Sequence, residues 1–448
     1  MTSRLVDRAS AKAAVSVGAV SAAIRLGTLF GPAVFGVTAA GVALPEVALA
    51  LRAGPAVAWV LTVHALALGI GTAVFGRLAD SWGVRAALAV GSFVLAAGTL
   101  ACFAAPNLGL LIAGRLVLAA GSGAMTSCAL ALLAAADTAE RPKLLATYGG
   151  IMAIFAAGAT LAGGIATTWL SWRVTLVLPA LSLLAVPFCV PLATRRGSRR
   201  PIDAIGAALL TLAVSSLVLL IQSQALSLPL GAVAAIGGVV ALCALGLNRR
   251  VRRRPEGFVP LPVATDAGFW LAALIGTGVY GGLFAMMYAA PQILGKTYGW
   301  AVLSIGFALL PGAVLGAVSS RRASRLGTVT SRRLLAGVAA ATAAAMAIAG
   351  TAGGGPYILV AATSLALASF AVTQVVITGE MSARLPIPRR GAGMGLLNLT
   401  FFVGGGIGSA VAGALAPWMG LPGSVAATAC FPLIAAVVAL TRVRPPRQ

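Results

Sequence analysis

The sequence predicts an all-α integral membrane protein. The chain of 448 residues is 60% hydrophobic and 9% charged, with a mean hydropathy of +1.01, which excludes an ordinary soluble domain of this length. Apolar segments of about 20 residues, the length of a helix that crosses a bilayer, recur along the chain. Most of the 32 lysines and arginines fall in alternate connections between these segments, as is typical of a polytopic membrane protein.

Fourteen segments are apolar enough to be transmembrane helices by this pattern. The first six lie near 27–50, 57–76, 86–105, 109–134, 146–168 and 174–193, the next two near 204–222 and 229–247, and the last six near 267–290, 301–319, 334–350, 357–378, 392–415 and 424–441. An even number of helices places both termini on one side of the membrane. The distribution of basic residues predicts that this is the cytoplasmic side of the cell membrane.

Two basic runs divide the chain into two halves with an inserted helix pair between them. The expected organisation is a tail at 1–26, a six-helix bundle at 27–193, a helix pair with basic flanks at 194–256, a second six-helix bundle at 257–441 and a tail at 442–448. A weak internal repeat supports two related halves, because the basic segment 321–327 after the tenth helix corresponds to segment 76–85 after the second. Membrane bundles built from two repeats are typical of alternating-access transporters.

The net charge of +23 does not predict nucleic-acid binding. Only Arg52, Arg173 and Lys296 lie in the other set of loops, and only Arg115 lies inside a span, so the charge follows membrane orientation. The chain lacks a phosphate-binding loop and a nucleophile elbow, and it has one histidine. We expect no enzymatic activity, no cofactor and no metal site. The expected partners are a small-molecule substrate, protons and the lipid bilayer, with the chain working as a monomer.

A short charged segment, Gly76 to Arg85, separates the second and third apolar segments. Gly76 is expected to allow close approach of a neighbouring helix, and Gly83 to allow a tight reversal. Asp80 is placed to accept from the free N–H groups of the next helix, with Arg77 and Arg85 as counter-charges. We expect Gly76, Asp80, Gly83 and Arg85 to form a conformational latch; the alternative is a basic loop that only fixes membrane orientation.

The spacing G-x-L-x-D-x-x-G-x-R of this segment resembles the signature loop between helices 2 and 3 of the major facilitator superfamily. Other stretches resemble the fourteen-helix drug:proton antiporters of that superfamily, namely Thr38 to Glu46, Leu111 to Arg115, Gly158 to Gly164 with Ser171-Trp172-Arg173, and Asp203 to Gly206. Gly69 to Gly76 and Gly391 to Phe401 are most similar to Gram-positive tetracycline and metal-tetracycline antiporters. The resemblance implies the major facilitator fold and drug export, with Gly158, Gly163 and Gly164 as the antiporter motif.

The chain departs from these antiporters at several embedded positions. Gly36 stands where an Asp is frequent in helix 1, Ala159 replaces a proline of the antiporter motif, Leu118 and Ala119 replace Gln and Gly, and Gly405 aligns with a Glu of the tetracycline branch. None of the nine acidic residues lies in the middle third of an expected span. Buried charges in membranes are costly and usually functional. Their scarcity therefore predicts a neutral, zwitterionic or anionic substrate.

Five ionisable residues are candidates for proton coupling. By resemblance Arg115 takes part in proton coupling or substrate contact, and the alternative is an arginine that binds backbone carbonyls or snorkels. His64 can exchange protons near neutrality, since an unperturbed histidine has a pKa of about 6.5; the alternative is a packed neutral ring. Glu46, Asp203 and Glu380 lie near helix ends, where each is either a proton stop or a solvated helix terminus.

Polar and aromatic residues within the apolar helices are candidates for substrate contact. They are Thr38, Tyr280, Tyr288, Gln292, Gln374, Asn398 and Phe401. Interhelical hydrogen bonding and core packing are the alternative roles. The predicted function is proton-coupled export of a small amphipathic compound, such as a tetracycline-like or other antibiotic, by alternating access. The alternatives are an uncoupled or differently coupled metabolite exporter and a non-transporting polytopic sensor or assembly protein.

Overall fold

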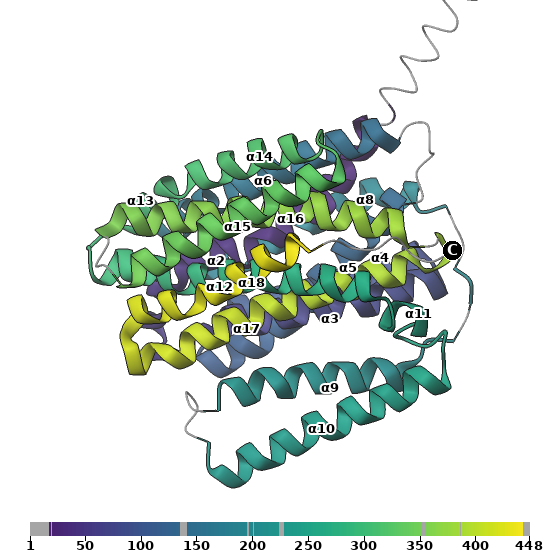
Figure 1. The fold of residues 1–448 in the computed structure, drawn as a ribbon, viewed down its shortest axis with the longest axis horizontal. Coiled ribbons are helices and arrows are strands. Elements are labelled where there is room, and N and C mark those ends of the chain that lie inside the picture. Colours follow the sequence, from purple (N-terminus) through teal and green to yellow (C-terminus); the bar gives the residue numbers. More distant parts are fainter. Residues whose placement is uncertain are drawn as a thin grey trace, which may run out of the picture.

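The computed structural model is a bundle of long helices that run roughly side by side (Figure 1). It describes residues 18, 20–134, 141–194, 197–199, 201–223, 228–351, 355–385 and 387–441, and these contain no strand. The expected tail at 442–448 lies outside the described residues, as do residues 1–17 and 19 of the tail expected at 1–26, whereas residues 20–26 are helical and begin the first apolar span. The N-terminal half contains η1 (Gly31–Gly36), α2 (Thr38–Ala50), η2 (Gly54–Val57), α3 (Ala58–Trp82), α4 (Val84–Ala104), α5 (Leu108–Ala134), α6 (Arg141–Trp169), α7 (Trp172–Val177), η3 (Leu178–Leu181), α8 (Ser182–Cys189) and η4 (Val190–Leu192).

The inserted pair consists of α9 (Ala204–Ile221) and α10 (Leu230–Arg253). The C-terminal half contains α11 (Leu261–Ala264), α12 (Ala267–Lys296), α13 (Val302–Ala308), α14 (Leu310–Ala323), α15 (Thr328–Thr351), α16 (Gly355–Arg384), α17 (Ile387–Thr428) and α18 (Cys430–Ala439).

Thirteen helical segments of the described chain are long and apolar enough to cross a membrane. The last of them, Ala392–Leu440, has 49 residues, whereas a bilayer-spanning helix needs about 20. Its helical geometry is interrupted at Gly420, where φ is 71° and ψ is 169°. The sequence expectation of fourteen spans divides this last segment into two.

Prolines account for breaks within several spans. The first span contains the 3₁₀ segment η1 with Pro32 at its start, and the sixth span is divided into four short helices with Pro179 and Pro191 at the starts of η3 and η4. Proline has no N–H to donate and clashes with the preceding turn, so it favours a new helix start over continuation of the old helix.

The two ends of the bundle differ in charge. We call the end at which α3, α10 and α16 finish the basic end, and the opposite end, where Trp169, Trp300 and Trp418 lie, the far end. Several helices continue past the expected limits of the apolar segments: α12 runs to Lys296 and α16 to Arg384. Hydropathy defines the part of a helix in the hydrocarbon layer, and helical backbone extends beyond it.

The charged segment 76–85 is not the loop that the sequence suggests. Helix α3 continues to Trp82 and α4 starts at Val84, so only Gly83, with φ 94° and ψ 156°, leaves the helical region. This backbone conformation is readily adopted only by glycine. The expectation for Gly83 therefore agrees with the geometry, while Asp80 lies in the last turn of α3 and does not cap α4.

The inserted pair lies along one side of the bundle, with α10 outermost (Figure 1). Only 11% of the apolar window of α9 and 6% of that of α10 is buried. Helix α9 contacts both halves, since Val218 packs with Leu66 of α3 and Ala410 of α17. The inserted pair thus touches the seam between α3 and α17.

Within the described chain the two halves meet chiefly through four helix pairs, α3 with α17, α6 with α13, α6 with α14, and α2 with α12. Glycines allow backbones to approach closely in two of them. A Cβ atom added at Gly41 would lie 2.8 Å from the carbonyl oxygen of Met287, and one added at Gly306 would lie 2.9 Å from that of Thr160. The α6–α13 contact lies toward the far end, so the halves are joined there by contacts that tolerate no larger side chain.

Candidate functional site

Arg115 is the centre of a polar cluster inside the N-terminal half. Its side chain is fully buried and donates to three backbone carbonyls on other segments. Nε donates to Val60 at 3.3 Å, Nη1 donates to Leu176 at 2.9 Å, and Nη2 donates to Gly36. The guanidinium therefore joins α3, α7 and η1. No carboxylate of the described chain forms an ion pair with it.

His64 lies beside this arginine on α3. The ring is fully buried, and neither Nδ1 nor Nε2 has a hydrogen-bond partner within the described chain. A Cβ atom added at Gly36 would lie 1.9 Å from Nε2, so the ring occupies the space that any side chain at position 36 would need. The charged group that acts on His64 is Arg115 of α5.

This arrangement gives the N-terminal half a fixed cation and one neutral proton acceptor. A buried donor or acceptor without a partner costs about 1–3 kcal/mol, so the two ring nitrogens of His64 are unfavourably placed among the described residues. A solvated imidazole binds a proton near neutrality. In this buried position the guanidinium of Arg115 stays charged, and its proximity makes a proton on His64 less favourable.

The C-terminal half contains an aromatic cluster around Tyr280. Its ring centroid lies 4.9 Å from that of Phe370, 5.2 Å from Phe401, 5.4 Å from Phe402 and 6.2 Å from Phe284. Three sequence candidates meet here, since Gln374 Nε2 of α16 donates to the Tyr280 hydroxyl of α12, and Phe401 comes from α17. Sequence reasoning did not identify Phe370, because an isolated phenylalanine in an apolar helix gives no signal.

The other candidates for substrate contact do not join this cluster through hydrogen bonds. Each bonds within its own helix or the turn before it: Thr38 Oγ1 donates to Val34 O at 2.9 Å, Gln292 Nε2 to Tyr288 O at 2.8 Å, and Asn398 Nδ2 to Met394 O at 3.1 Å. All four candidate side chains of this group, Thr38, Tyr288, Gln292 and Asn398, are buried. Local bonding thus satisfies most of their polar groups.

The latch expected at segment 76–85 is not formed in this conformation. The side chains of Asp80 and Arg85 are exposed, and neither forms an ion pair among the described residues. Arg77 binds the backbone of the segment between α10 and α11 and does not bind Asp80. Gly76 does not mediate a close approach either, because an added Cβ would lie 3.9 Å from its nearest neighbour, Ser127 Cβ.

The three remaining proton candidates occupy different environments. Glu46 is half-buried near the far end of α2 and forms no ion pair in the described part of the chain. Glu380 of α16 lies 3.2 Å from Arg332 Nε of α15. Asp203 is the N-cap of α9 and lies 2.8 Å from Arg250 Nη2 of α10. Glu380 and Asp203 thus have structural partners at the basic end.

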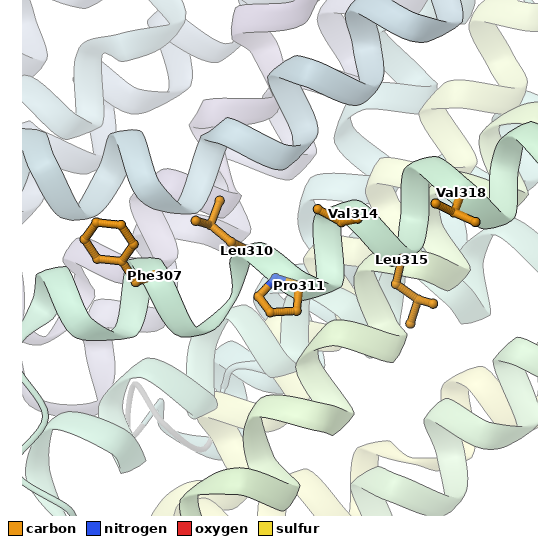
Figure 2. A pocket seen from close by; sticks show the side chains of 6 residues that line it. All are labelled: Phe307, Leu310, Pro311, Val314, Leu315 and Val318. Atoms are coloured by element: carbon orange, nitrogen blue, oxygen red, sulfur yellow. The ribbon is translucent and has the colours of Figure 1, made fainter.

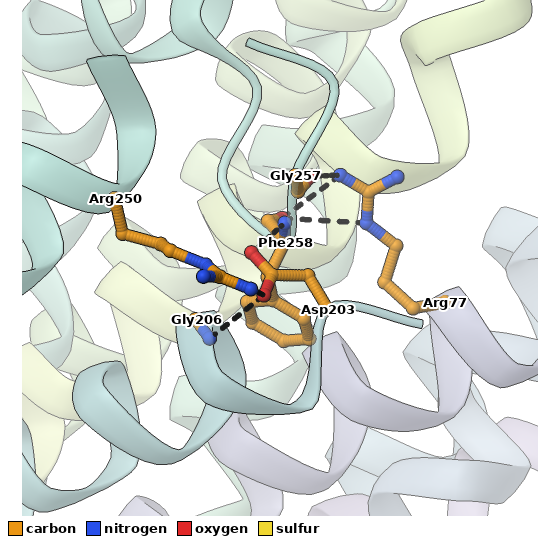
Figure 3. Close-up of polar contacts among 6 residues, drawn as sticks. All are labelled: Arg77, Asp203, Gly206, Arg250, Gly257 and Phe258. Atoms are coloured by element: carbon orange, nitrogen blue, oxygen red, sulfur yellow. Dashed lines mark hydrogen bonds and ion pairs between the residues drawn. The ribbon is translucent and has the colours of Figure 1, made fainter. Parts of the chain in front are cut away.

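Asp203 joins the ends of the inserted pair to the segment that follows it (Figure 3). Its carboxylate accepts from the backbone N–H of Gly206 at 3.1 Å, from that of Phe258 at 3.2 Å, and from Arg250 at 2.8 Å and 3.0 Å. Burial by itself raises the pKa of this carboxyl group, but the bonds from Arg250 and the two N–H groups outweigh burial and hold the pKa below its usual value.

We expect Asp203→Asn to lower the thermal midpoint of the purified protein by roughly 1–3 °C, because charge-assisted bonds to Arg250 are lost. A carboxylate with a lowered folded-state pKa stabilises the fold above its unfolded-state value, near 3.9, and this contribution is lost as the pH falls through the folded-state pKa. The difference between wild type and variant should therefore stay constant from about pH 8 to 5 and shrink only near pH 4 and below. Thermal unfolding in detergent across this range measures it; equal midpoints at pH 7 would contradict it.

The glycines of the expected antiporter motif differ in what they contact. A Cβ atom added at Gly163 would lie 2.8 Å from the Cα and carbonyl oxygen of Ala39, and one at Gly164 would lie 3.3 Å from the Val302 carbonyl oxygen. Gly163 thus packs α6 against α2, and Gly164 packs it against α13 of the other half. Gly158 has no neighbour within 4 Å of an added Cβ.

An apolar pocket lies on α13 and α14 (Figure 2). It is lined by Phe307, Leu310, Pro311, Val314, Leu315 and Val318. Phe307 is 53% exposed and Val314 is 57% exposed, so the pocket lies on the surface of the bundle and contains none of the candidate residues. Within the described residues no three His, Cys, Asp or Glu side chains gather to hold a metal ion.

A further polar group on the seam escaped sequence reasoning. The hydroxyls of Thr62 on α3 and Ser409 on α17 are 2.9 Å apart, and Gln222 Nε2 donates to Thr62 Oγ1 at 3.3 Å. All three side chains are buried. A small hydroxyl residue gives no signal in an apolar helix, and only the amide of Gln222 at the end of the span 204–222 was a visible clue.

The fold and these buried groups define a polytopic helical membrane protein with two halves, each of which encloses polar residues. A family model described as Major Facilitator Superfamily matches residues 26–383. The chain belongs to this superfamily of membrane transporters, and it is a multi-pass membrane protein and not an enzyme. This agrees with the fold class expected from the sequence.

Three of the relatives are named as resistance proteins. The chain is 32% identical over 305 residues to the puromycin resistance protein of Streptomyces alboniger, covering 65% of this chain and 59% of that protein. It is 29% identical over 304 residues to the lincomycin resistance protein of Streptomyces lincolnensis, covering 62% and 60%. It is 25% identical over 396 residues to the multidrug resistance protein Stp of Mycobacterium tuberculosis, covering 84% and 72%. The matches thus span about 60% of the length of the first two relatives.

Proposed function

We propose that this chain exports a small amphipathic compound, such as an antibiotic or another drug, in exchange for protons. Membership of the superfamily and similarity to puromycin, lincomycin and multidrug resistance proteins support drug export. Two halves joined by close glycine contacts support alternating access, because such contacts can part without breaking a side-chain core.

The observation that carries proton coupling is the pair His64 and Arg115. His64 is the single histidine of the chain, and its two ring nitrogens are buried without partners beside a buried cation. The embedded carboxylates that the resemblance implies are absent, as at Gly36, and the ring of His64 fills that space. His64 is therefore the proton carrier of the exchange, and Arg115 is the fixed charge that controls it.

The repulsion between Arg115 and a protonated His64 suggests a cycle with two states. In the conformation closed at the far end, a proton on His64 would place a second cation beside Arg115 in a dry interior, which is unfavourable. The neutral imidazole belongs to this state, in which the compound enters from the basic end. When the far end opens and the contacts of Arg115 with Gly36 and Val60 rearrange, His64 takes a proton as the compound leaves.

The aromatic cluster around Tyr280 is the proposed contact surface for the compound. The aromatic cluster around Tyr280 offers ring faces, one hydroxyl and the amide of Gln374, which suit a compound with an apolar aromatic part and few hydrogen-bonding groups. No buried acid of the described helices compensates a multiply charged cation. A tetracycline-like, neutral, zwitterionic or anionic compound fits these conditions best, and the relatives add puromycin and lincomycin as probes.

We further propose fourteen membrane crossings, with the break at Gly420 dividing the last segment in two. An even number of crossings places both termini on one side. The arginines at the basic end support the cytoplasm as that side of the cell membrane. Both six-helix halves lie within one chain, which supports a monomer as the working unit.

Replacing His64 by Phe tests the proposed coupling. Everted membrane vesicles with a pH-sensitive dye are energised, and tetracycline, puromycin, lincomycin and neutral antibiotics are added in turn. We expect a compound that discharges the proton gradient in wild type to cause at least about tenfold less proton flux in His64→Phe, because Phe keeps the ring but cannot bind a proton. Uptake of the labelled compound down its own gradient is expected to persist.

The matched control is Tyr148→Phe, which removes another buried unpartnered group of the same half that is not ionised near neutrality. It should retain the proton flux. Equal proton flux in wild type and His64→Phe would exclude His64 as the carrier. Compound movement without proton flux in wild type would instead favour the uncoupled exporter.

A further inference from the structure

Both connections of the inserted pair are bound to the basic end of α3. In the connection before α9, the Ser198 N–H donates to the Asp80 carbonyl at 2.9 Å, and the Arg199 N–H donates to the Ser81 carbonyl at 2.8 Å. These carbonyls belong to the last turn of α3, where the helix itself supplies no donor. The inserted pair therefore completes the end of α3.

The connection after α10 is bound to the same end of α3. Arg77 Nη2 donates to the carbonyl of Phe258 at 2.8 Å and also to that of Gly257 (Figure 3). Asp203, the N-cap of α9, accepts from the Phe258 N–H of this connection and from Arg250 in the last turn of α10. The two helices and their connections form one unit anchored on α3 at the basic end.

At the far end the same unit reaches the seam between the halves. Gln222 directly follows α9, and its amide donates to Thr62 of the N-terminal half, whose hydroxyl is bonded to Ser409 of the C-terminal half. Val218, one turn earlier, packs against both α3 and α17. Gln222 is only 2% exposed, so it is part of the interface and not a surface amide.

We propose that the inserted pair is a clamp that stabilises the conformation closed at the far end, with Gln222 as the residue that holds the Thr62–Ser409 contact. This rests on the alternating access proposed above. When the halves part at the far end, the Thr62–Ser409 bond breaks, and so does the chain of hydrogen bonds from Gln222 through Thr62 to Ser409, in which each bond strengthens the next in a dry environment. The bonds of the two connections to the end of α3 keep α9 on α3. Gln222 therefore favours the closed state in every cycle. The clamp sets the ratio of the two states and takes no part in binding compound or proton.

The test measures that ratio directly by electron paramagnetic resonance. The five cysteines are replaced, and spin labels are attached at Leu170 and Tyr298, which are 70% and 39% exposed and lie at the far ends of the two halves. We expect Gln222→Leu to lower the ratio of short to long label distances by about fivefold relative to wild type, as loss of one buried hydrogen bond predicts. The control Leu212→Ala changes the exposed face of α9 and should leave the ratio unchanged.

Thr62→Val provides the second arm, because it keeps the shape of the side chain and removes the hydroxyl. In a double-mutant cycle, the Gln222→Leu and Thr62→Val effects should be smaller together than their sum, since both remove the same contact. Unchanged distances in Gln222→Leu, or strictly additive effects, would overturn the clamp. These distances need neither compound nor proton, so a failure of the His64 test leaves this proposal standing, and an unchanged ratio leaves export standing.

Discussion

Arg115→Lys is expected to reduce compound-induced proton flux by at least about tenfold. The arginine donates to carbonyls of three segments, Gly36, Val60 and Leu176, from a fully buried position. Lysine keeps the charge but carries one nitrogen, which cannot reach three acceptors that a planar fork reaches. Each lost hydrogen bond to a charged group costs about 1.5–3 kcal/mol. A cost of 1.4 kcal/mol changes an equilibrium constant about tenfold. Vesicle assays at matched expression measure the effect.

Arg173→Lys is the matched control for this change. Arg173 also donates to two backbone carbonyls, Phe103 at 3.0 Å and Ala105 at 2.6 Å, but at a partly exposed position at the far end. Water there replaces lost bonds, so the flux should fall less than about twofold. Retention of half or more of the flux in Arg115→Lys, or equal losses in both variants, would contradict the assigned role of Arg115.

Gly306→Ala is expected to shift the protein away from the conformation closed at the far end and to reduce export by about tenfold. The added Cβ would lie 2.9 Å from the Thr160 carbonyl oxygen, and a backbone atom cannot move aside as a side-chain end can. Helices α6 and α13 must therefore separate. The spin labels at positions 170 and 298 report this as a loss of the short distance.

Gly337→Ala controls for the change in helix propensity. Both substitutions favour the helix by about 1 kcal/mol, but an added Cβ at Gly337 of α15 has no neighbour within 4 Å. The Gly337 variant should match wild type in distance and export. If both variants behave alike, the α6–α13 contact does not control the closing of the far end.

The membrane-spanning architecture could be predicted because hydropathy and the placement of arginines report directly on the bilayer. The positions at which helices come into close contact could not be predicted from the sequence. Gly76 was expected at a close approach, yet it has space, whereas an added Cβ at Gly71 would lie 2.4 Å from the Ala120 carbonyl oxygen. The way in which α3 and α5 cross decides which glycine lies where the two helices come closest. Helices that are apolar on all sides give no periodic signal for that geometry.

The sequence predicted which residues belong to the candidate site, but it did not predict which of them lie together. Arg115 and His64 are unusual residue types for a span, so sequence reasoning identified them. Their packing around Gly36 depends on how α3, α5 and η1 cross. Asp80 was expected to pair locally, but Arg77 bonds to the connection after α10 instead, a contact between residues distant in sequence.

The central claim is that His64 exchanges a proton when the compound binds. The most direct test adds the compound identified in vesicles to purified protein in weakly buffered detergent solution with a pH indicator, and compares wild type with His64→Phe. The account predicts that wild type releases protons on binding, with an amount that falls as the starting pH rises, and that His64→Phe binds the compound without release. Equal proton release from both proteins would contradict it.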